Sequence, residues 1–326
     1  MSLRKPRSGG SRRSSRTAAR RREARIAHPA TTISRASPSA ARTATTMAAI
    51  RSTSRTRRMS WRRSTRTSHS RSDEPSMRIV AWNILAGGGK RVASIAKQLE
   101  RWQPCVVMLC EFRGTPPSQT LASHLSRMGL THQRSTAETE NPAKNALLVA
   151  SRWPLRCFHS AGEPEEPCRW LSVRVASPEP FSLGAMHIPN RSTGRKYVYH
   201  DAVVSLAARW TRRPAVLLGD TNTGWPELDE EVRCFGPREE AFLESLQGLG
   251  WRDAFRQLHA RARAYTWYSP NGSNGFRLDQ AFLSPRILPR LKRVSYQWGG
   301  GLRAGLSDHA ALLVDLSDGH SPGNGK

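Results

Sequence analysis

The chain has 326 residues and a formal net charge of +27, a length that allows one large α/β domain with an appendage or two small domains. No stretch approaches the roughly 20 apolar residues that a membrane-spanning helix needs, so we expect neither a membrane span nor a secretory signal. The five cysteines, an odd number without a CxxC pair, predict neither a disulfide framework nor a zinc site and favour a cytoplasmic location.

Residues 1–76 differ in composition from the rest of the chain. They contain 20 of the 52 Lys and Arg residues but only three acids, and Arg, Ser, Thr and Ala dominate. Such a segment buries too little apolar surface to offset the entropy of ordering, so we expect a disordered extension. Three roles stay open: a basic tail that binds nucleic acid, an organelle transit peptide, or an upstream extension outside a working protein that starts at Met77.

Short apolar runs of strand length alternate with segments of helical period from Met77 onward. A buried strand at 78–84 stops at three glycines, and the next apolar residues recur at i, i+3, i+4 and i+7 from Val92, which predicts a helix that ends before Pro104. Further strands are predicted at 106–110, 146–150, 170–175, 181–187, 215–219, 278–283 and 310–316. Further helices are predicted at about 118–128, 201–210 and 239–249.

This order of elements indicates the fold class. Many strands with interspersed helices, without strict βαβ alternation and without repeats, predict an α+β fold of two packed sheets covered by helices on the outside. We expect one domain over residues 77–317 and a flexible tail at 318–326, because the tail contains Gly and Ser.

Polar residues stand where several of the apolar runs end, which is where sites on a sheet scaffold are usually built. These residues are Asn83, Glu111, His187, Asp220, Asn222, Asp279, Asp308 and His309. A strand period of two predicts that Asp220 and Asn222 face the same side, and Gly219 permits close approach to the backbone. Asp220 could then bind metal or act as a base, and Asn222 could orient a nucleophile. The alternative is an ordinary turn.

Two other strand ends carry chemistry of the same kind. Glu111 follows five apolar residues and is a hard oxygen ligand suited to Mg²⁺ or Mn²⁺, unless it is only a surface glutamate. His309 can stabilise or protonate a developing phosphorane oxygen, while Asp308 beside it can bind metal. The alternative for His309 is a structural role.

Six separated segments together carry a resemblance to a known family. They are Ala81-Trp82-Asn83-Ile84, Leu109-Cys110-Glu111-Phe112, Met186-His187-Ile188-Pro189-Asn190, Leu218-Gly219-Asp220-Thr221-Asn222, Phe276-Arg277-Leu278-Asp279 and Leu306-Ser307-Asp308-His309. In this order they resemble the endonuclease/exonuclease/phosphatase superfamily. The resemblance implies a four-layer α/β sandwich of two mixed sheets flanked by helices, with the site at one edge of the sheets.

The resemblance also implies roles for the matching positions. Glu111 binds the metal, with Asn83 and Asp308 close by. Asp220 and Asn222 position and activate water. Asp279 orients His309. If His187 and His309 both face the scissile phosphate, the two imidazoles can share proton transfer and stabilisation of the oxyanion. Nearby basic residues either hold substrate phosphates or form a solvated basic loop: Arg113, Arg191, Arg195 and Lys196.

The function expected from these features is that of a Mg²⁺- or Mn²⁺-dependent phosphoesterase. The basic balance of the domain favours a nuclease with nucleic acid as substrate. A phosphatase or phosphodiesterase of inositol or lipid phosphates is the alternative, and a non-catalytic nucleic-acid-binding protein is a third hypothesis. No protein partner is evident, and we expect a monomer.

The subfamily stays open because one segment is mixed. Where this chain has His187, members that resemble abasic-site endonucleases and exonuclease III usually have Tyr, and members that resemble deoxyribonuclease I have His. The following Pro189-Asn190 is more similar to the abasic-site group. From His187 we predict that catalysis does not require an abasic site in the substrate.

Overall fold

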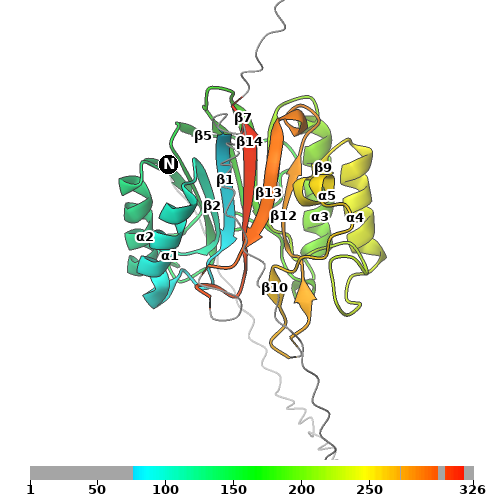
Figure 1. Cartoon of the computed structure of the whole chain (residues 1–326), viewed down its shortest axis with the longest axis horizontal. Helices are drawn as coiled ribbons and strands as arrows, with labels where there is room; N and C mark the ends of the chain where they lie inside the picture. The colour runs from blue at the N-terminus through cyan, green and yellow to red at the C-terminus, as the bar shows by residue number, and fades with distance from the viewer. Residues whose placement is uncertain (1–75, 272, 300–304, 319–326) are drawn as a thin grey trace, which may run out of the picture. The chain divides into compact units, whose positions relative to one another are not determined.

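The computed structural model describes residues 76–271, 273–299 and 305–318 (Figure 1). The expected disorder of residues 1–76 and the expected flexibility of the tail 318–326 fall, apart from Ser76 and Asp318, outside the described residues. All five cysteines are free thiols. Within the described part of the chain, no helix is long and apolar enough to cross a membrane.

Two six-stranded sheets form the centre of the fold. In spatial order the first sheet contains β13 (Leu291–Gln297), β14 (Ala311–Ser317), β1 (Ser76–Asn83), β2 (Val106–Phe112), β4 (Ala146–Ser151) and β3 (His132–Ser135). The second contains β5 (Leu155–Cys157), β6 (Trp170–Val175), β7 (Phe181–His187), β8 (Ala215–Asp220), β12 (Asp279–Leu283) and β9 (Arg252–Asp253). A small ribbon pairs β10 (Trp267–Tyr268) with β11 (Gly275–Phe276).

Both sheets are mixed in the same way. Each has one parallel pair, β1 with β2 and β7 with β8, and antiparallel neighbours elsewhere. In each parallel pair the two strands end at the same edge of their sheet, since parallel strands run in one direction. Four of the residues expected to form the site lie at these strand ends: Asn83, Glu111, His187 and Asp220.

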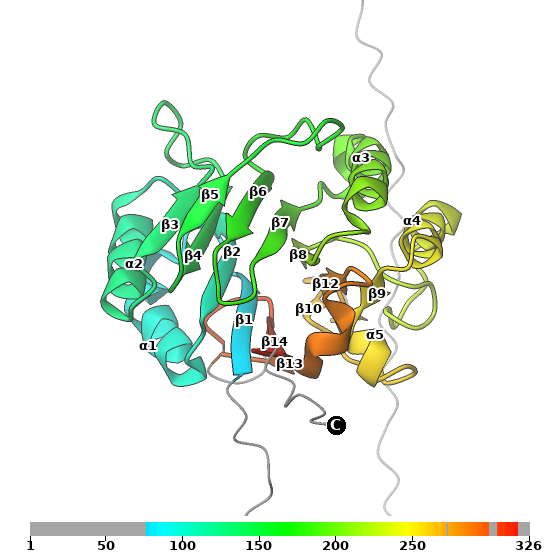
Figure 2. The same cartoon turned by 90° about the horizontal axis from the view of Figure 1, so that it is seen from above.

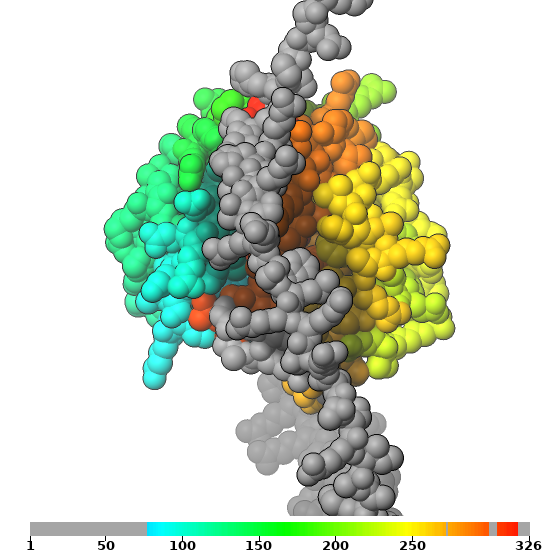
Figure 3. Space-filling view, viewed as in Figure 1, coloured from blue at the N-terminus to red at the C-terminus, as the bar shows by residue number. Residues whose placement is uncertain are grey.

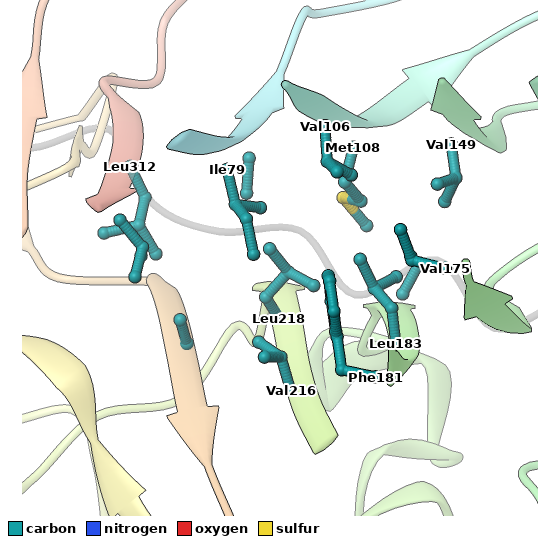
Figure 4. Packing of buried hydrophobic residues seen from close by; sticks show 14 of the residues in the cluster. Ile79, Val106, Met108, Val149, Val175, Phe181, Leu183, Val216, Leu218 and Leu312 are labelled. Carbon is teal, nitrogen blue, oxygen red and sulfur yellow. The ribbon is translucent and has the colours of Figure 1, made fainter. Parts of the chain in front are cut away.

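The core between the sheets follows from the two-residue period of the strands. In β1, Ile79 faces the opposite sheet, whereas Val80 faces the outside of its own sheet. In β8, Leu218 faces the opposite sheet and Leu217 faces the outside of its own sheet. Figure 4 shows side chains of both sheets, Ile79 and Leu218 among them, meeting in this layer. Burying each such side chain contributes roughly 1.5–3 kcal/mol.

Helices cover the two outer faces (Figure 2). On the first sheet lie α1 (Val92–Trp102) and α2 (Pro116–Arg127), and on the second α3 (Lys196–Trp210) and α4 (Pro237–Gly248). A short helix, α5 (Ala254–Leu258), packs beside β12 and β13. In the space-filling view the cyan surface of α1 and the yellow surface of α4 and α5 lie on opposite sides (Figure 3). The expected fold of two packed mixed sheets flanked by helices is confirmed.

Candidate active site

Glu111 owes its position to an irregularity at the end of β2. The register between β2 and β4 shifts between Cys110 and Phe112, and Glu111 has φ 57°, in the left-handed region. Such bulges redirect a side chain beside a site, and non-glycine residues stay in this region only where the surroundings hold them. Here the Gly87 amide donates to the Glu111 carbonyl at 2.7 Å.

The segment after β1 holds the carboxylate of Glu111. Residues 85–89 all have positive φ, including Leu85 at 53° and Ala86 at 52°. The Ala86 amide donates to Glu111 Oε2 at 2.8 Å, and the Leu85 amide donates to Asn83 Oδ1 at 3.1 Å. This left-handed turn therefore fixes both side chains at the ends of β1 and β2.

Asn83 connects the two sheets across the site. Its Nδ2 donates to Asp220 Oδ2 at 3.1 Å and lies 3.4 Å from Glu111 Oε1. The amide therefore separates two carboxylates that would otherwise repel each other. In this arrangement Asn83 presents a donor to both, so its contribution is to orient the two acids.

Two imidazoles flank Asp220, which is almost fully buried. His187 Nε2, at the end of β7, lies 3.6 Å from Asp220 Oδ2, and His309 Nε2 lies 3.8 Å from the same oxygen. Both distances are too long for hydrogen bonds, so these contacts are electrostatic. On its other side, His309 Nδ1 is 2.9 Å from Asp279 Oδ2. The orienting partner expected for His309 is in place.

The two imidazoles have opposite pKa shifts. Burial lowers the pKa of His187 to about 4, with Asp220 opposing the shift. Burial also disfavours charge on His309, but the carboxylates of Asp279 and Asp220 outweigh it and raise its pKa to about 10. Burial raises the pKa of Asp220, and the two imidazoles oppose that shift. At neutral pH the site therefore contains a neutral His187 and a protonated His309.

Asn222 reaches the site by a different route from the expected one. The strand ends at Asp220, and Asn222 has φ 45°, so the two-residue period does not extend to it and that part of the interpretation is wrong. Instead the Asn222 amide donates to Asp220 Oδ1 at 3.0 Å, and its Nδ2 donates to the Ile188 carbonyl at 2.9 Å. The expectation for Gly219 is confirmed, because a Cβ there would lie 1.9 Å from the Met186 carbonyl oxygen.

Asp308 is exposed at the rim, and two residues to which the sequence analysis assigned no role contact it or its neighbours. Ser307 Oγ donates to the Asn83 carbonyl at 2.6 Å, and the indole of Trp267 donates to Asp308 Oδ2 at 3.2 Å. Ser307 belongs to the recognised segment before His309, but nothing in the apolar pattern indicates Trp267. Trp267 is connected to the site by a β-bridge with His309. This is a tertiary contact, which a pattern in the local sequence does not reveal.

A cavity of about 310 Å³ opens beside these residues. Asn222 and Trp267 line it together with the ion pair of Lys196 and Glu239, and Phe235, Phe276 and Leu278 give it an apolar wall. A cleft with apolar walls and a few polar groups is the usual form of a ligand site. The cavity can therefore hold part of a substrate whose reacting group lies at Asp220.

The carboxylates fit a hard divalent cation. Among the described residues, no three or more His, Cys, Asp or Glu side chains form a group that could hold a metal ion by themselves. Mg²⁺ is usually bound through one or two carboxylates, with water and substrate phosphate completing its shell. Glu111 and Asp308 provide oxygen ligands of this kind, and the donor set does not resemble a zinc site.

The four basic residues near the site differ in their availability. Arg113 donates from Nε to Asn145 at 2.7 Å, and Arg195 forms an exposed ion pair with Glu166. Arg191 donates to the Tyr197 hydroxyl and lies at the cavity. Lys196 is buried and bound to protein groups, as described below.

Comparisons with known proteins identify a family and a shared fold. The model of the Endonuclease/Exonuclease/phosphatase family matches residues 80–309. Three solved structures are similar to this chain and each covers 74% of it: an AP endonuclease from Archaeoglobus fulgidus (TM-score 0.62, 18% identity, 99% of that chain), the 3' phosphatase NExo from Neisseria bound to product DNA hairpin (0.58, 21%, 99%) and the AP endonuclease LMAP from Leishmania major (0.59, 16%, 88%). At these identities they show a shared fold. None of the curated proteins compared matches the chain.

Proposed function

Because the chain belongs to the endonuclease/exonuclease/phosphatase family, whose members hydrolyse phosphoester bonds, we propose that it is a divalent-metal-dependent nuclease. One observation supports the proposal most directly. A buried carboxylate, Asp220, lies between two imidazoles of opposite protonation, and Asn83 joins it to Glu111. This arrangement contains an acid, a base and metal-ligating oxygens at one edge of the two sheets.

The proposed mechanism gives separate tasks to Asp220, Asn222, His309 and Asp279. Asn222, bonded to Asp220 through its backbone amide, holds the attacking water. As the water oxygen bonds to phosphorus, Asp220 accepts the proton of the water, the bond from phosphorus to the leaving oxygen breaks, and that oxygen takes a proton from solvent. The His309 imidazolium donates to a phosphoryl oxygen as negative charge develops there, and Asp279 keeps its ring oriented and charged. When bound by Glu111 and Asp308, Mg²⁺ or Mn²⁺ would neutralise charge on the phosphate.

Nucleic acid is the substrate that the remaining observations favour. Residues 77–326 hold 32 basic and 22 acidic residues, which suits a polyanion. The cavity beside Asn222 has an apolar wall that can receive a sugar or a base next to the scissile phosphate. The similar structure from Neisseria is bound to a DNA hairpin. Five free thiols support a cytoplasmic location, and we propose a monomer.

A substrate panel tests the proposal. The purified full chain is incubated with Mg²⁺, Mn²⁺ or EDTA and with plasmid DNA, abasic duplex, single strands, RNA, 3'-phosphorylated DNA or inositol phosphates. We expect metal-dependent cleavage of nucleic acid that Asp220→Asn abolishes. Turnover of inositol phosphates alone would establish the phosphatase alternative, and tight DNA binding without any turnover would establish a binding protein.

A further inference from the structure

A buried lysine contacts the backbone of Asn222 from the side away from Asp220. Lys196 is the first residue of α3, and its Nζ donates to the Asn222 carbonyl at 2.7 Å. The same ammonium lies 2.8 Å from Glu239 Oε1, in the first turn of α4. Side-chain exposure is 5% for Lys196 and 1% for Glu239, so water does not screen this pair.

Helix stability alone does not favour a lysine at this position. A cation at a helix N-terminus opposes the helix dipole, and burial lowers the pKa of Lys196, with Glu239 opposing the shift. A buried ion pair can often be exchanged for apolar residues of similar volume without loss of stability. What an apolar residue cannot replace is a donor to a carbonyl. Residues that oppose local preferences are most often found at functional sites.

The carbonyl that Lys196 binds belongs to a residue in an unusual conformation. Asn222 has φ 45°, a region that a non-glycine residue keeps only when its surroundings fix it. Its amide is held by Asp220, its side chain by the Ile188 carbonyl and its own carbonyl by Lys196. Removing Lys196 releases the one contact that holds this peptide from the helix side, while Asp220 and Ile188 remain.

Glu239 in turn fixes the ammonium of Lys196. Its Oε2 accepts from the Gly236 amide at 3.1 Å, and its Oε1 accepts from the Tyr197 hydroxyl at 3.1 Å. Both oxygens of the Glu239 carboxylate, at the start of α4, are therefore held by hydrogen bonds, which fixes the position of the ion-pair partner of Lys196. The ion pair of Lys196 and Glu239 thus connects the Asn222 carbonyl to the starts of both helices, and Arg191 lies 3.5 Å from the other oxygen of Glu239.

We propose that Lys196 is a positioning residue for the phosphodiester-cleaving site, acting through Asn222, and that Glu239 holds it in place. This inference rests on the proposed nuclease function. Lys196 also lies in the wall of the cavity of about 310 Å³, and in this scheme its ammonium holds the Asn222 carbonyl and Glu239 rather than the substrate phosphate. The residue therefore affects the chemical step more than substrate affinity.

The primary test compares Lys196→Met with Arg238→Met. Arg238 also joins α4 to α3, through an ion pair with Asp201 at 3.2 Å, but these side chains are 56% and 70% exposed. With DNA and with bis(p-nitrophenyl) phosphate, we expect Lys196→Met to lower kcat roughly 10- to 100-fold, as a small misplacement of a catalytic group does, with KM within about twofold. Arg238→Met should match the wild type in both.

A double-mutant cycle with Asn222→Ala separates positioning from general damage. If Lys196 acts through Asn222, Lys196→Met should cost less than about twofold in kcat when Asn222 is already Ala. Additive losses, an unchanged kcat, or a raised KM with normal kcat would overturn the inference. Should Lys196→Met fail to fold, Lys196→Met/Glu239→Gln removes both charges and takes its place. A wild type without turnover would instead overturn the proposed function, and this inference with it.

Discussion

A fully buried arginine links the stability of the fold to the position of Asp279. Arg277 donates from Nε and Nη2 to Asp229 at 2.7 and 2.8 Å, and from Nη2 to Asp253 at 2.6 Å. Its Nη1 donates to the Tyr296 hydroxyl at 3.1 Å, and that hydroxyl donates to the Asp279 carbonyl at 2.8 Å. Replacing Arg277 by Met leaves two carboxylates without their shared cation.

The expected loss can be worked out from these contacts. Removing one partner of a buried ion pair costs roughly 3–5 kcal/mol. The lower end applies because Arg256 also forms an ion pair with Asp229 and partly compensates. About 3 kcal/mol corresponds to a melting temperature lowered by roughly 6–12 °C in a domain of this size. Thermal unfolding followed by circular dichroism measures it, and an Arg277→Met variant that melts with the wild type would refute the reasoning.

The same variant should show a characteristic pH dependence. Burial alone would raise the pKa of Asp229, but Arg277 and Arg256 outweigh it, and its pKa is lowered. A lowered carboxylate pKa stabilises the fold above the ordinary value of about 4, and this contribution is lost only as pH falls through the folded value. Without Arg277, burial favours the neutral form of Asp229. Protonation of Asp229 at lower pH therefore removes an unfavourable buried charge and restores part of the stability that the variant has lost. The difference in melting temperature between the wild type and Arg277→Met should be largest near pH 7 and should decrease toward about pH 4–5.

Three further predictions concern the metal ligand Glu111, the two histidines and the N-terminal extension. Glu111→Gln should weaken Mn²⁺ binding, measured by titration calorimetry, together with activity, and unchanged metal affinity would remove Glu111 from the metal site. His309→Ala and His187→Ala should each lower kcat by roughly 10² to 10⁴ with metal binding retained, since a positioned acid or base contributes about this much. A silent His187→Ala, or a strict requirement for abasic duplex, would contradict the assignment of His187. A chain that begins at Met77 should keep wild-type kcat on short substrates and lose salt-dependent affinity for long polyanions; loss of folded protein would show that the first 76 residues are needed.

Much of the fold could be predicted because most strands are buried on both faces. Such strands appear as continuous apolar runs, as in β2 and β8, and the period of α1 was equally clear. By contrast β13 was not predicted, because only Val294 among its residues is buried and its pairing with β14 is a long-range contact. The first turn of α3 could not be predicted because one of its buried residues is Lys196, which apolar periodicity does not count, while the apolar Val198 is exposed.

The site was predictable in its members and not in its geometry. The strand ends give the polar residues because a sheet edge is where apolar runs stop. The bulge at Glu111 and the turn at Asn222 depend on φ values that the local sequence does not specify, since neither residue is glycine. Both residues are contacted by partners that are distant in the sequence, since Gly87 donates to the Glu111 carbonyl and Lys196 donates to the Asn222 carbonyl. Neither the hydrophobic periodicity of the sequence nor the conformational preferences of single residues predict tertiary contacts of this kind.

The two histidines show why residue type alone does not assign a role. Both are buried, and both lie within 4 Å of the same oxygen of Asp220. What distinguishes them is the second partner: His309 has Asp279 at its other nitrogen, whereas Arg169, near His187, adds to the lowering of the pKa of His187. A carboxylate at Nδ1 keeps His309 charged at neutral pH, so it suits stabilisation of a developing oxyanion. His187 stays neutral because its pKa is lowered to about 4, so it carries no charge with which to stabilise that oxyanion.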